Sequence, residues 1–379
     1  MTEMYRCPRC GQAQYFEASA CGSCGTALGY HPSTDTLLGL EPATGGWVDG
    51  AGNSNGATLC RNSGLGECNW LVESGADNGY CRACRHNRTI PDLGVPGVIH
   101  RWRKIEVAKR RLIRSLIAHR LPLEVWTSDV AGLGFDFLYD ASAEQAMAPS
   151  VHTGHSGGLI TINLIEADDA ARERIRQQMG EPYRTLLGHF RHEVAHHYWD
   201  RLVANSGWLD EFRGQFGDER ADYQTALQAY YASGAPADWS DRFVSAYASS
   251  HPWEDFAETF AHYLHICATL STLARVGGSF DAPSIGEGRI AINFDPHKVD
   301  TATLVRNWMP ISFALNIVNR SMGQPDLYPF RLTMPVVLKL DFCNRLVADA
   351  GGLLLAPSDV TGLRAMVALL DQSARVPLA

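Results

Sequence analysis

The 379-residue sequence lacks a long apolar run, an apolar segment near its first residue and an excess of positive charge. No stretch approaches the roughly 18 apolar residues that cross a bilayer, so we expect no membrane span. The opening MTEMYRCPRCGQ has no apolar core of an export signal, which favours a cytoplasmic protein. A formal net charge of −8 disfavours nucleic acid as a partner, because phosphate backbones attract positively charged surfaces.

Cysteine is concentrated at one end of the chain, since eight of the ten lie in the first 84 residues. Without an export signal, metal binding is favoured over disulfides. Two CxxCG turns form a first set, in which each turn directs its sulfurs at one ion and the following glycine permits a positive φ angle. We predict one structural zinc at Cys7, Cys10, Cys21 and Cys24. The second set is spaced more widely, and we predict a second structural zinc at Cys60, Cys68, Cys81 and Cys84.

The cysteine-rich segments have three possible roles: a folding staple, a docking surface for a protein, or a docking surface for nucleic acid. Residues 1–92 contain six arginines and nine acidic residues, a balance that disfavours phosphate binding. We expect a staple or a protein contact, and only steep salt dependence of binding would favour nucleic acid. The two remaining cysteines, Cys267 and Cys343, stand in apolar surroundings and are expected to be buried.

A new domain is expected after PDLGVPG, residues 91–97, because its prolines and glycines oppose helix and strand continuity. Beyond it, apolar residues recur at helical spacing from Trp102 to Leu116. The arginines between them, which include Arg110 and Arg114, are expected to form a solvated face. Three β-like runs follow, at residues 123–126, 135–139 and 158–165.

The stretch RHEVAHHYWD, residues 191–200, lies on a helix that we expect to begin near Glu181 and Pro182. His192 and His196 are four residues apart, so one helical turn places both imidazoles where they can share a zinc ion. Glu193 can take a proton from a zinc-activated water and pass it to a leaving amine. Asp200, one turn beyond His196, is an open candidate for supporting that imidazole.

A catalytic zinc needs a third protein ligand. The metzincin pattern would place Gly and His after the HExxH motif, at the positions that Trp199 and Leu202 occupy here. The third ligand must therefore come from elsewhere in the chain. Two acidic segments qualify, GDERAD at residues 217–222 and the segment from Tyr247 to His262. In the second, Pro252 favours a helix that starts near Trp253. Helical spacing then places Glu254, Glu258 and His262 in one row, so one carboxylate can bind metal while another holds a ligand imidazole. An exposed acidic row near a helix N-terminus is the alternative.

These residues resemble a known family. HExxH followed at long distance by Tyr and then by Glu-x-Phe-Ala-Glu is similar to the gluzincin arrangement of anthrax lethal factor and the Mlc titration factor group. The chain more closely resembles the bacterial zinc-binding metallopeptidase family with N-terminal zinc ribbons. The segments that carry this resemblance are CNWLV, NRTIPDLG, FGDERADY, HPWEDFAETFAHYLHI and DLYPF. The resemblance implies zinc held by His192, His196 and Glu254. It also implies Glu193 as the general base and Tyr247 as a phenol donor to the oxyanion. Glu258 would contact a metal ligand and not the metal itself.

The resulting prediction is an α+β protein with a zincin-like metallopeptidase domain. We expect a zinc ribbon in residues 1–40, a second zinc-binding segment in 41–96 and the peptidase domain in 97–379, with its catalytic core in 97–270 and a helical part in 271–379. The strand at Ile160–Ile165 would be the edge strand that receives a peptide or protein substrate. The alternative is a non-catalytic, zinc-stapled interaction protein whose HExxH zinc is structural.

Overall fold

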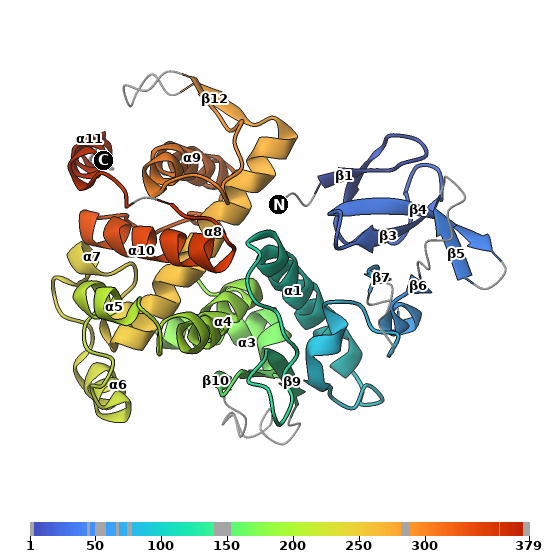
Figure 1. The fold of residues 1–379 in the computed structure, drawn as a ribbon, viewed down its shortest axis with the longest axis horizontal. Coiled ribbons are helices and arrows are strands. Elements are labelled where there is room, and N and C mark those ends of the chain that lie inside the picture. The colour runs from blue at the N-terminus through green and yellow to red at the C-terminus, as the bar shows by residue number, and fades with distance from the viewer. Residues whose placement is uncertain are drawn as a thin grey trace. The chain divides into compact units, whose positions relative to one another are not determined.

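The structure is a computed structural model that describes residues 4–43, 46–49, 58–65, 68–73, 78–139, 153–281, 289–355 and 357–373. Its elements, drawn in Figure 1, belong to two compact units. Unit 1 comprises Met1–Ile117 and Leu123–Ile175, and unit 2 comprises Ala118–Pro122 and Arg176–Ala379. The combination of small sheets and helices confirms the predicted α+β class. Within the described ranges, no helix is both long and apolar enough to cross a bilayer.

Unit 1 begins with short antiparallel strands, and the cysteines lie in the turns and loops next to these strands. The strands are β1 (Met4–Arg6) with β2 (Ala13–Tyr15), β3 (Ala27–His31) with β4 (Thr36–Ala43) and β5 (Gly46–Asp49), and β6 (Thr58–Leu59) with β7 (Leu71–Val72). Gly11 and Gly25, which follow the two CxxC turns, have φ angles of 74° and 72°. The positive φ predicted at these glycines is therefore confirmed.

One aromatic core joins the two cysteine-rich segments. The Trp70 ring lies 4.7 Å from the Tyr30 ring and 6.0 Å from the Phe16 ring. The backbone N–H of Tyr30 donates to the carbonyl of Asn69 at 2.7 Å. Strand β4 also runs through residue 40, the expected boundary between the segments. The two segments therefore share side-chain packing and backbone pairing.

Helix α1 (Val98–Ala118) buries the apolar stripe expected of it, namely Trp102, Ile105, Ala108, Leu112 and Leu116. The expectation of a solvated basic face is wrong for Arg110 and Arg114, which are both buried. Arg114 Nε donates to Asp35 Oδ1 at 2.9 Å, and Arg110 Nη1 lies 3.7 Å from Glu106 Oε2. These two arginines are buried and not solvated because they pair with acidic residues inside unit 1.

The main sheet of unit 1 has the strand order β10-β11-β9-β8. Its strands are β8 (Asn87–Thr89), β9 (Gly134–Leu138), β10 (Gly154–Ser156) and β11 (Leu159–Asn163). Two of the three β-like runs are therefore confirmed as strands, whereas the first contributes only an isolated bridge at Val125. The prediction of an edge strand at Ile160–Ile165 is wrong, because β11 pairs with β9 on one side and β10 on the other. A short hairpin, invisible to the apolar pattern, adds β10 as the outer strand.

The remaining elements are mostly helices of unit 2. They are α3 (Asp169–Gln178, across the unit boundary), α4 (Leu186–Leu202), α5 (Leu209–Phe216), α6 (Tyr223–Ser233), α7 (Trp239–Arg242), α8 (Pro252–Val276), α9 (Thr301–Ser321), α10 (Met334–Ala350) and α11 (Val360–Ser373), with a hairpin of β12 (Ser279–Asp281) and β13 (Arg289–Ala291). Short 3₁₀ turns complete the described elements: η1 (Arg61–Leu65), η2 (Cys84–His86), η3 (Leu164–Ala167) and η4 (Tyr247–Ser249). The helical C-terminal part is thus confirmed.

Two capping groups set the starts of the helices that carry the site. The Thr185 hydroxyl accepts from the backbone N–H of Gly188 at 3.0 Å, so α4 begins at Leu186 and not near Glu181 as predicted. Pro182 precedes the helix and does not lie in its first turn. For α8 the prediction is confirmed, because Pro252 occupies the first turn and His251 caps it through Nδ1.

An aromatic cluster anchors α8 in unit 2. Phe256 is fully buried, and its ring lies 6.0 Å from Phe212, 5.7 Å from Phe216 and 6.3 Å from Phe342. These rings come from α5 and α10, which both pack against α8. Helix α4 packs along α8 as well, as Figure 1 shows. The rigid pair of α4 and α8 is the frame on which the site is built.

Candidate metal centre

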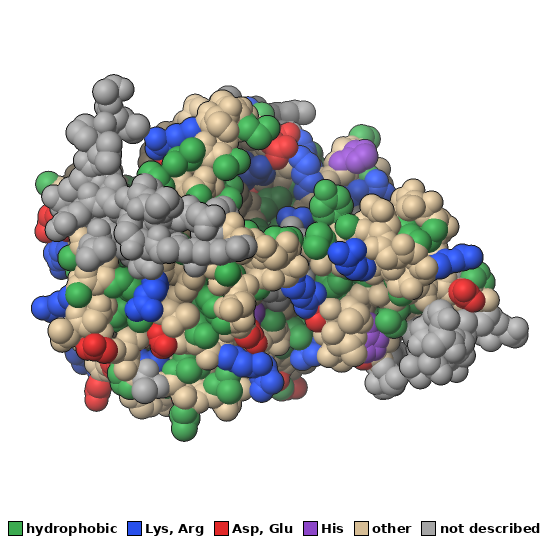
Figure 2. All heavy atoms as spheres, turned by 90° about the horizontal axis from the view of Figure 1, so that it is seen from above, with side chains coloured by type: hydrophobic (Ala, Val, Ile, Leu, Met, Phe, Trp, Pro, Cys, Tyr) green, Lys and Arg blue, Asp and Glu red, His purple; other side chains and the backbone are tan. Residues whose placement is uncertain are grey.

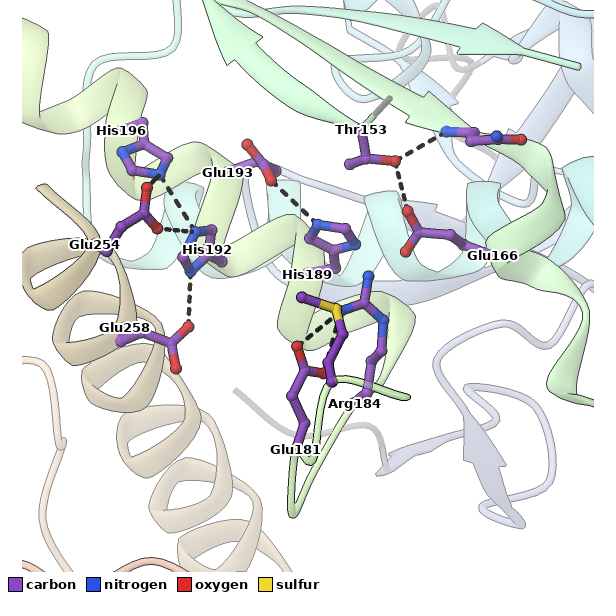
Figure 3. Close-up of polar contacts among 12 residues, drawn as sticks. Thr153, Glu166, Glu181, Arg184, His189, His192, Glu193, His196, Glu254 and Glu258 are labelled. Carbon is purple, nitrogen blue, oxygen red and sulfur yellow. Dashed lines mark hydrogen bonds and ion pairs between the residues drawn. The ribbon is translucent and has the colours of Figure 1, made fainter. Parts of the chain in front are cut away.

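Helix α4 places His192 and His196 on one face, as the i, i+4 spacing predicts. Their Nε2 atoms lie 3.3 Å apart. Two neutral imidazole nitrogens that face each other at this distance repel one another through their lone pairs unless a proton or a cation lies between them. The pair therefore has the arrangement of two metal ligands (Figure 3).

Helix α8 supplies the third candidate ligand atom. Glu254 Oε2 lies 3.1 Å from His192 Nε2, and Glu254 Oε1 lies 3.7 Å from His196 Nε2. One ligand atom from each of these three residues fits within a mutual distance of 4.8 Å. The Glu254 side chain is 1% exposed, and its Oε2 has no hydrogen bond of good geometry to any described residue. A buried carboxylate whose oxygens lie against two imidazoles fits a metal ion well.

Glu258, one turn further along α8, supports the imidazole of His192 from behind. Its Oε1 lies 2.7 Å from His192 Nδ1, which leaves Nε2 directed toward Glu254 and His196. Its Oε2 accepts a hydrogen bond from Ser245 Oγ at 2.7 Å. Such a carboxylate fixes the tautomer and the orientation of a ligand histidine. The alternative of an exposed acidic row is wrong, because Glu254 is buried and Glu258 is hydrogen-bonded on both oxygens.

The charges around His192 favour a cation in the centre. Burial would lower the pKa of His192, but Glu254 and Glu258 outweigh burial and hold that pKa well above its ordinary value. Burial would raise the pKa of Glu254, but His192, His196 and Tyr223 together hold it at about 2. An ionised carboxylate and two imidazoles are ligands that zinc prefers. The residues present therefore fit the zinc ion that the motif predicts.

Glu193 lies on α4 beside these ligands and is directed away from Glu258 (Figure 3). Its Oε1 contacts His189 Nε2 at 3.1 Å, one helical turn earlier. Burial would raise the pKa of Glu193, but His189 outweighs it and lowers that pKa, so the carboxylate stays ionised. An ionised carboxylate beside a metal centre can accept a proton.

Two tyrosines border the metal centre. The ring of Tyr247, in η4, lies 6.1 Å from the His192 ring, and burial raises the pKa of its phenol well above the ordinary value. Tyr223, the first residue of α6, donates its hydroxyl proton to Glu254 Oε1 at 2.7 Å. Tyr247 was expected here, whereas Tyr223 was not singled out, although it ends the FGDERADY segment.

The acidic residues of GDERAD, the other candidate source of a ligand, are engaged elsewhere. Asp218 pairs with Arg220 at 2.7 Å, and Glu219 pairs with Arg213. Asp222 caps α6 by accepting from the backbone N–H of Thr225 at 2.7 Å. Glu254 is therefore the acid that lies against the two imidazoles, and the contribution of this segment is the adjacent Tyr223.

Ser245 and His189 are further site residues that were not expected from the sequence. Ser245 acts on Glu258, thirteen residues later, and no motif spacing indicates this contact. His189 lies one helical turn before Glu193, so the i, i+4 spacing was a signal that could have found it. Asp200 is exposed near the end of α4, and its support of His196 stays a prediction. Cys267 and Cys343 are fully buried, as expected.

Both predicted cysteine clusters assemble in unit 1. In the first, Cys7 Sγ lies 3.7 Å from Cys24 Sγ, and Cys10 Sγ lies 3.6 Å from Cys21 Sγ. In the second, Cys68 Sγ lies 3.6 Å from Cys81 Sγ and 3.8 Å from Cys84 Sγ, and Cys60 belongs to the same group. These separations suit four thiolates around one zinc ion, with Zn–S bonds of about 2.3 Å. All four cysteines of the second cluster are buried, whereas Cys10 of the first is exposed.

Figure 2 draws one face of the described residues, and charges of both signs are mixed on that face. In the view of Figure 2, Lys and Arg side chains are interspersed with acidic, apolar and other polar groups. This distribution agrees with the net charge of −8.

Two histidines and a glutamate arranged as zinc ligands, together with two tetracysteine clusters, are the site pattern of a metal-binding protein. The model of the family described as "Putative zinc-binding metallo-peptidase" matches residues 98–346, and a zinc-ribbon domain model matches residues 4–95. The chain belongs to this metallopeptidase family and carries an N-terminal zinc-ribbon region. It is similar to the uncharacterized protein Rv2568c of Mycobacterium tuberculosis, with 42% identity over 353 residues, 91% of this chain and 95% of the relative. The same values hold for the uncharacterized protein Mb2598c of Mycobacterium bovis. No solved structure matches the chain significantly.

Proposed function

We propose that the chain is a gluzincin-type zinc peptidase that hydrolyses peptide bonds in a peptide or protein substrate. His192, His196 and Glu254 would hold the catalytic zinc, and each tetracysteine cluster would hold one structural zinc. The observation that carries this proposal is the buried carboxylate of Glu254, whose Oε2 lies 3.1 Å from His192 Nε2 and whose Oε1 lies 3.7 Å from His196 Nε2. Glu258 meanwhile holds the His192 ring through Nδ1. The protein would act in the cytoplasm, and its ribbons could contact a protein partner.

A zinc ion in this centre would supply a Lewis acid that polarises the scissile carbonyl and activates a water molecule. The protein's own groups perform the proton transfers. Glu193 accepts the proton of the attacking water and returns it to the leaving nitrogen, with Oε1 held by His189. Glu258 keeps the His192 ring oriented throughout. The Tyr247 phenol, whose raised pKa keeps it protonated, donates to the oxyanion as negative charge develops.

The test is the pair of variants Glu193→Gln and Asp210→Asn, both assayed on peptide libraries. Asp210 is an exposed acid on α5 and serves as the control. We expect Glu193→Gln to lower kcat by about 10²–10⁴-fold with its zinc content unchanged, and Asp210→Asn to retain full activity. A wild-type protein that carries all its zinc and cleaves no peptide would support the non-catalytic interaction protein instead. Equal activity of Glu193→Gln and wild type would contradict the mechanism.

A further inference from the structure

Tyr223 and His192 contact different oxygens of the Glu254 carboxylate. Its hydroxyl donates to Glu254 Oε1 at 2.7 Å, while Glu254 Oε2 lies 3.1 Å from His192 Nε2. The two oxygens of one carboxylate therefore have different partners. Burial and the nearby Glu254 carboxylate raise the pKa of Tyr223, so the phenol remains a hydrogen-bond donor.

We propose that Tyr223 is a positioning residue that occupies Oε1 of Glu254, so that this carboxylate presents only Oε2 to a metal ion. The inference rests on the proposed metal site. Two imidazole nitrogens and one carboxylate oxygen make three protein ligands, which leaves a position open for water and substrate in a four-coordinate site. A carboxylate that used both oxygens would fill that position. Tyr223 thereby keeps the centre suited to catalysis.

The position of the Tyr223 phenol is fixed independently of the metal centre. Its ring lies 5.2 Å from the His251 ring, in edge contact, and 5.9 Å from the Trp253 ring. His251 is itself held, because its Nε2 donates to the Ala221 carbonyl at 3.0 Å and its Nδ1 accepts from the Trp253 N–H at 3.1 Å. This framework joins the start of α6 to the start of α8. The hydroxyl is thus placed by ring packing, and removing it alone leaves the packing intact.

The second tyrosine of the site has a different position. The Tyr247 ring faces His192, and its turn precedes α8. Tyr223 instead comes from α6, whose eleven residues, YQTALQAYYAS, include no charged side chain. Its phenol is therefore the neutral donor that α6 directs to the ligand carboxylate. The two phenols therefore have different roles: Tyr223 binds the ligand carboxylate, and Tyr247 is available to the substrate.

The test compares Tyr223→Phe with Tyr230→Phe by metal binding alone, so it does not depend on peptide cleavage. Tyr230 lies on the same helix with its ring 5.8 Å from Tyr247, and its loss removes a phenol without touching Glu254. Zn²⁺ affinity of the His/Glu centre is measured by chelator competition. We expect Tyr223→Phe to weaken it by about tenfold or more, as is typical when a hydrogen bond to a ligand is removed, and Tyr230→Phe to leave it unchanged.

The absorption spectrum of Co²⁺ placed in this centre reports how many oxygens of Glu254 bind the metal. The ribbons keep zinc in this experiment, and the absence of thiolate-to-cobalt absorption verifies that they do. We expect an intense four-coordinate spectrum in wild type and Tyr230→Phe, and a weaker, higher-coordinate spectrum in Tyr223→Phe. A higher-coordinate spectrum in the wild type would overturn the proposal without any variant. Unchanged affinity and spectrum in Tyr223→Phe would do the same. Absence of metal binding by the wild type would instead refute the proposed function on which it rests.

Discussion

Ser245 and Glu258 are joined by a 2.7 Å hydrogen bond from Oγ to Oε2, which connects the turn carrying Tyr247 to the helix carrying Glu254. The same Oγ accepts from the backbone N–H of Ala248 at 3.1 Å, so it also binds a backbone group within η4. One hydroxyl thus orders both the support of His192 and the turn that places Tyr247. This double role makes Ser245 a sensitive position.

Ser245→Ala should lower kcat by about tenfold and leave the ribbon zinc unchanged, because Glu258 and the backbone N–H of Ala248 each lose one partner. The matched control is Ser249→Ala in the same turn, whose Oγ donates only to the Ala246 carbonyl at 2.6 Å. Steady-state kinetics and total zinc measured on both variants give the comparison. Equal loss of kcat in the two variants would mean that the turn, and not the contact with Glu258, is responsible.

Glu254→Ala should reduce the zinc bound per chain by one ion, because the centre keeps only two imidazole ligands. The tetracysteine clusters lie in unit 1 and should keep their zinc. Asp218→Asn is the control, since this acid pairs with Arg220 away from the centre. Elemental analysis after dialysis measures the zinc content. Wild-type zinc content in Glu254→Ala would show that the third ligand comes from elsewhere.

Gly158→Ala should destabilise unit 1 by at least about 2 kcal/mol more than Gly157→Ala. Gly158 has φ of +85°, and a Cβ there would lie 2.1 Å from the carbonyl oxygen of Gly132, which is backbone and cannot rotate away. Gly157 also has a positive φ, +53°, but a Cβ there meets nothing within 4 Å. Gly157→Ala should therefore lower the free energy of unfolding only by the roughly 1–2 kcal/mol that a left-handed alanine costs. Urea unfolding of both variants would reveal the difference, and equal midpoints would contradict the packing.

Acid should destabilise unit 2 through His262. Burial lowers the pKa of His262 to about 4, although Glu258 opposes the shift, whereas an unfolded histidine titrates near 6.5. Between about pH 6.5 and 4 the unfolded chain binds a proton that the folded chain does not, so stability falls as the pH falls through this window. Its Nδ1 is hydrogen-bonded to the Tyr328 hydroxyl at 2.8 Å, and the half-buried His265 ring lies 6.1 Å from the His262 ring.

The matched variant is His262→Gln, which retains a polar group for Tyr328 and does not titrate. Between pH 7 and pH 5, the wild type should lose about 2 kcal/mol more unfolding free energy than this variant. Unfolding curves at the two pH values measure the difference. Parallel losses would assign the acid sensitivity to other groups, such as His265.

Local spacing alone determined several features of this protein. Residues one helical turn apart must share a face, so the spacing of His192 and His196 is enough to pair them, and the CxxC turns with their glycines are equally local. The apolar stripe of α1 and the start of α8 at Pro252 follow from the same short-range rules. Backbone geometry over four residues is independent of the rest of the chain, and this is why these predictions are confirmed.

Tertiary structure decided everything that depends on contacts between distant segments. Only the packing of α4 on α8 placed the Glu254 carboxylate at the imidazoles, and only α6 brought Tyr223 to Oε1. The burial of Arg114 was mispredicted for the same reason, because local periodicity does not indicate an ion pair with the distant Asp35. The interior position of β11 was mispredicted because local periodicity does not indicate the neighbouring strand β10 either. Burial and strand order are properties of the whole fold, because each depends on which distant surface covers a residue.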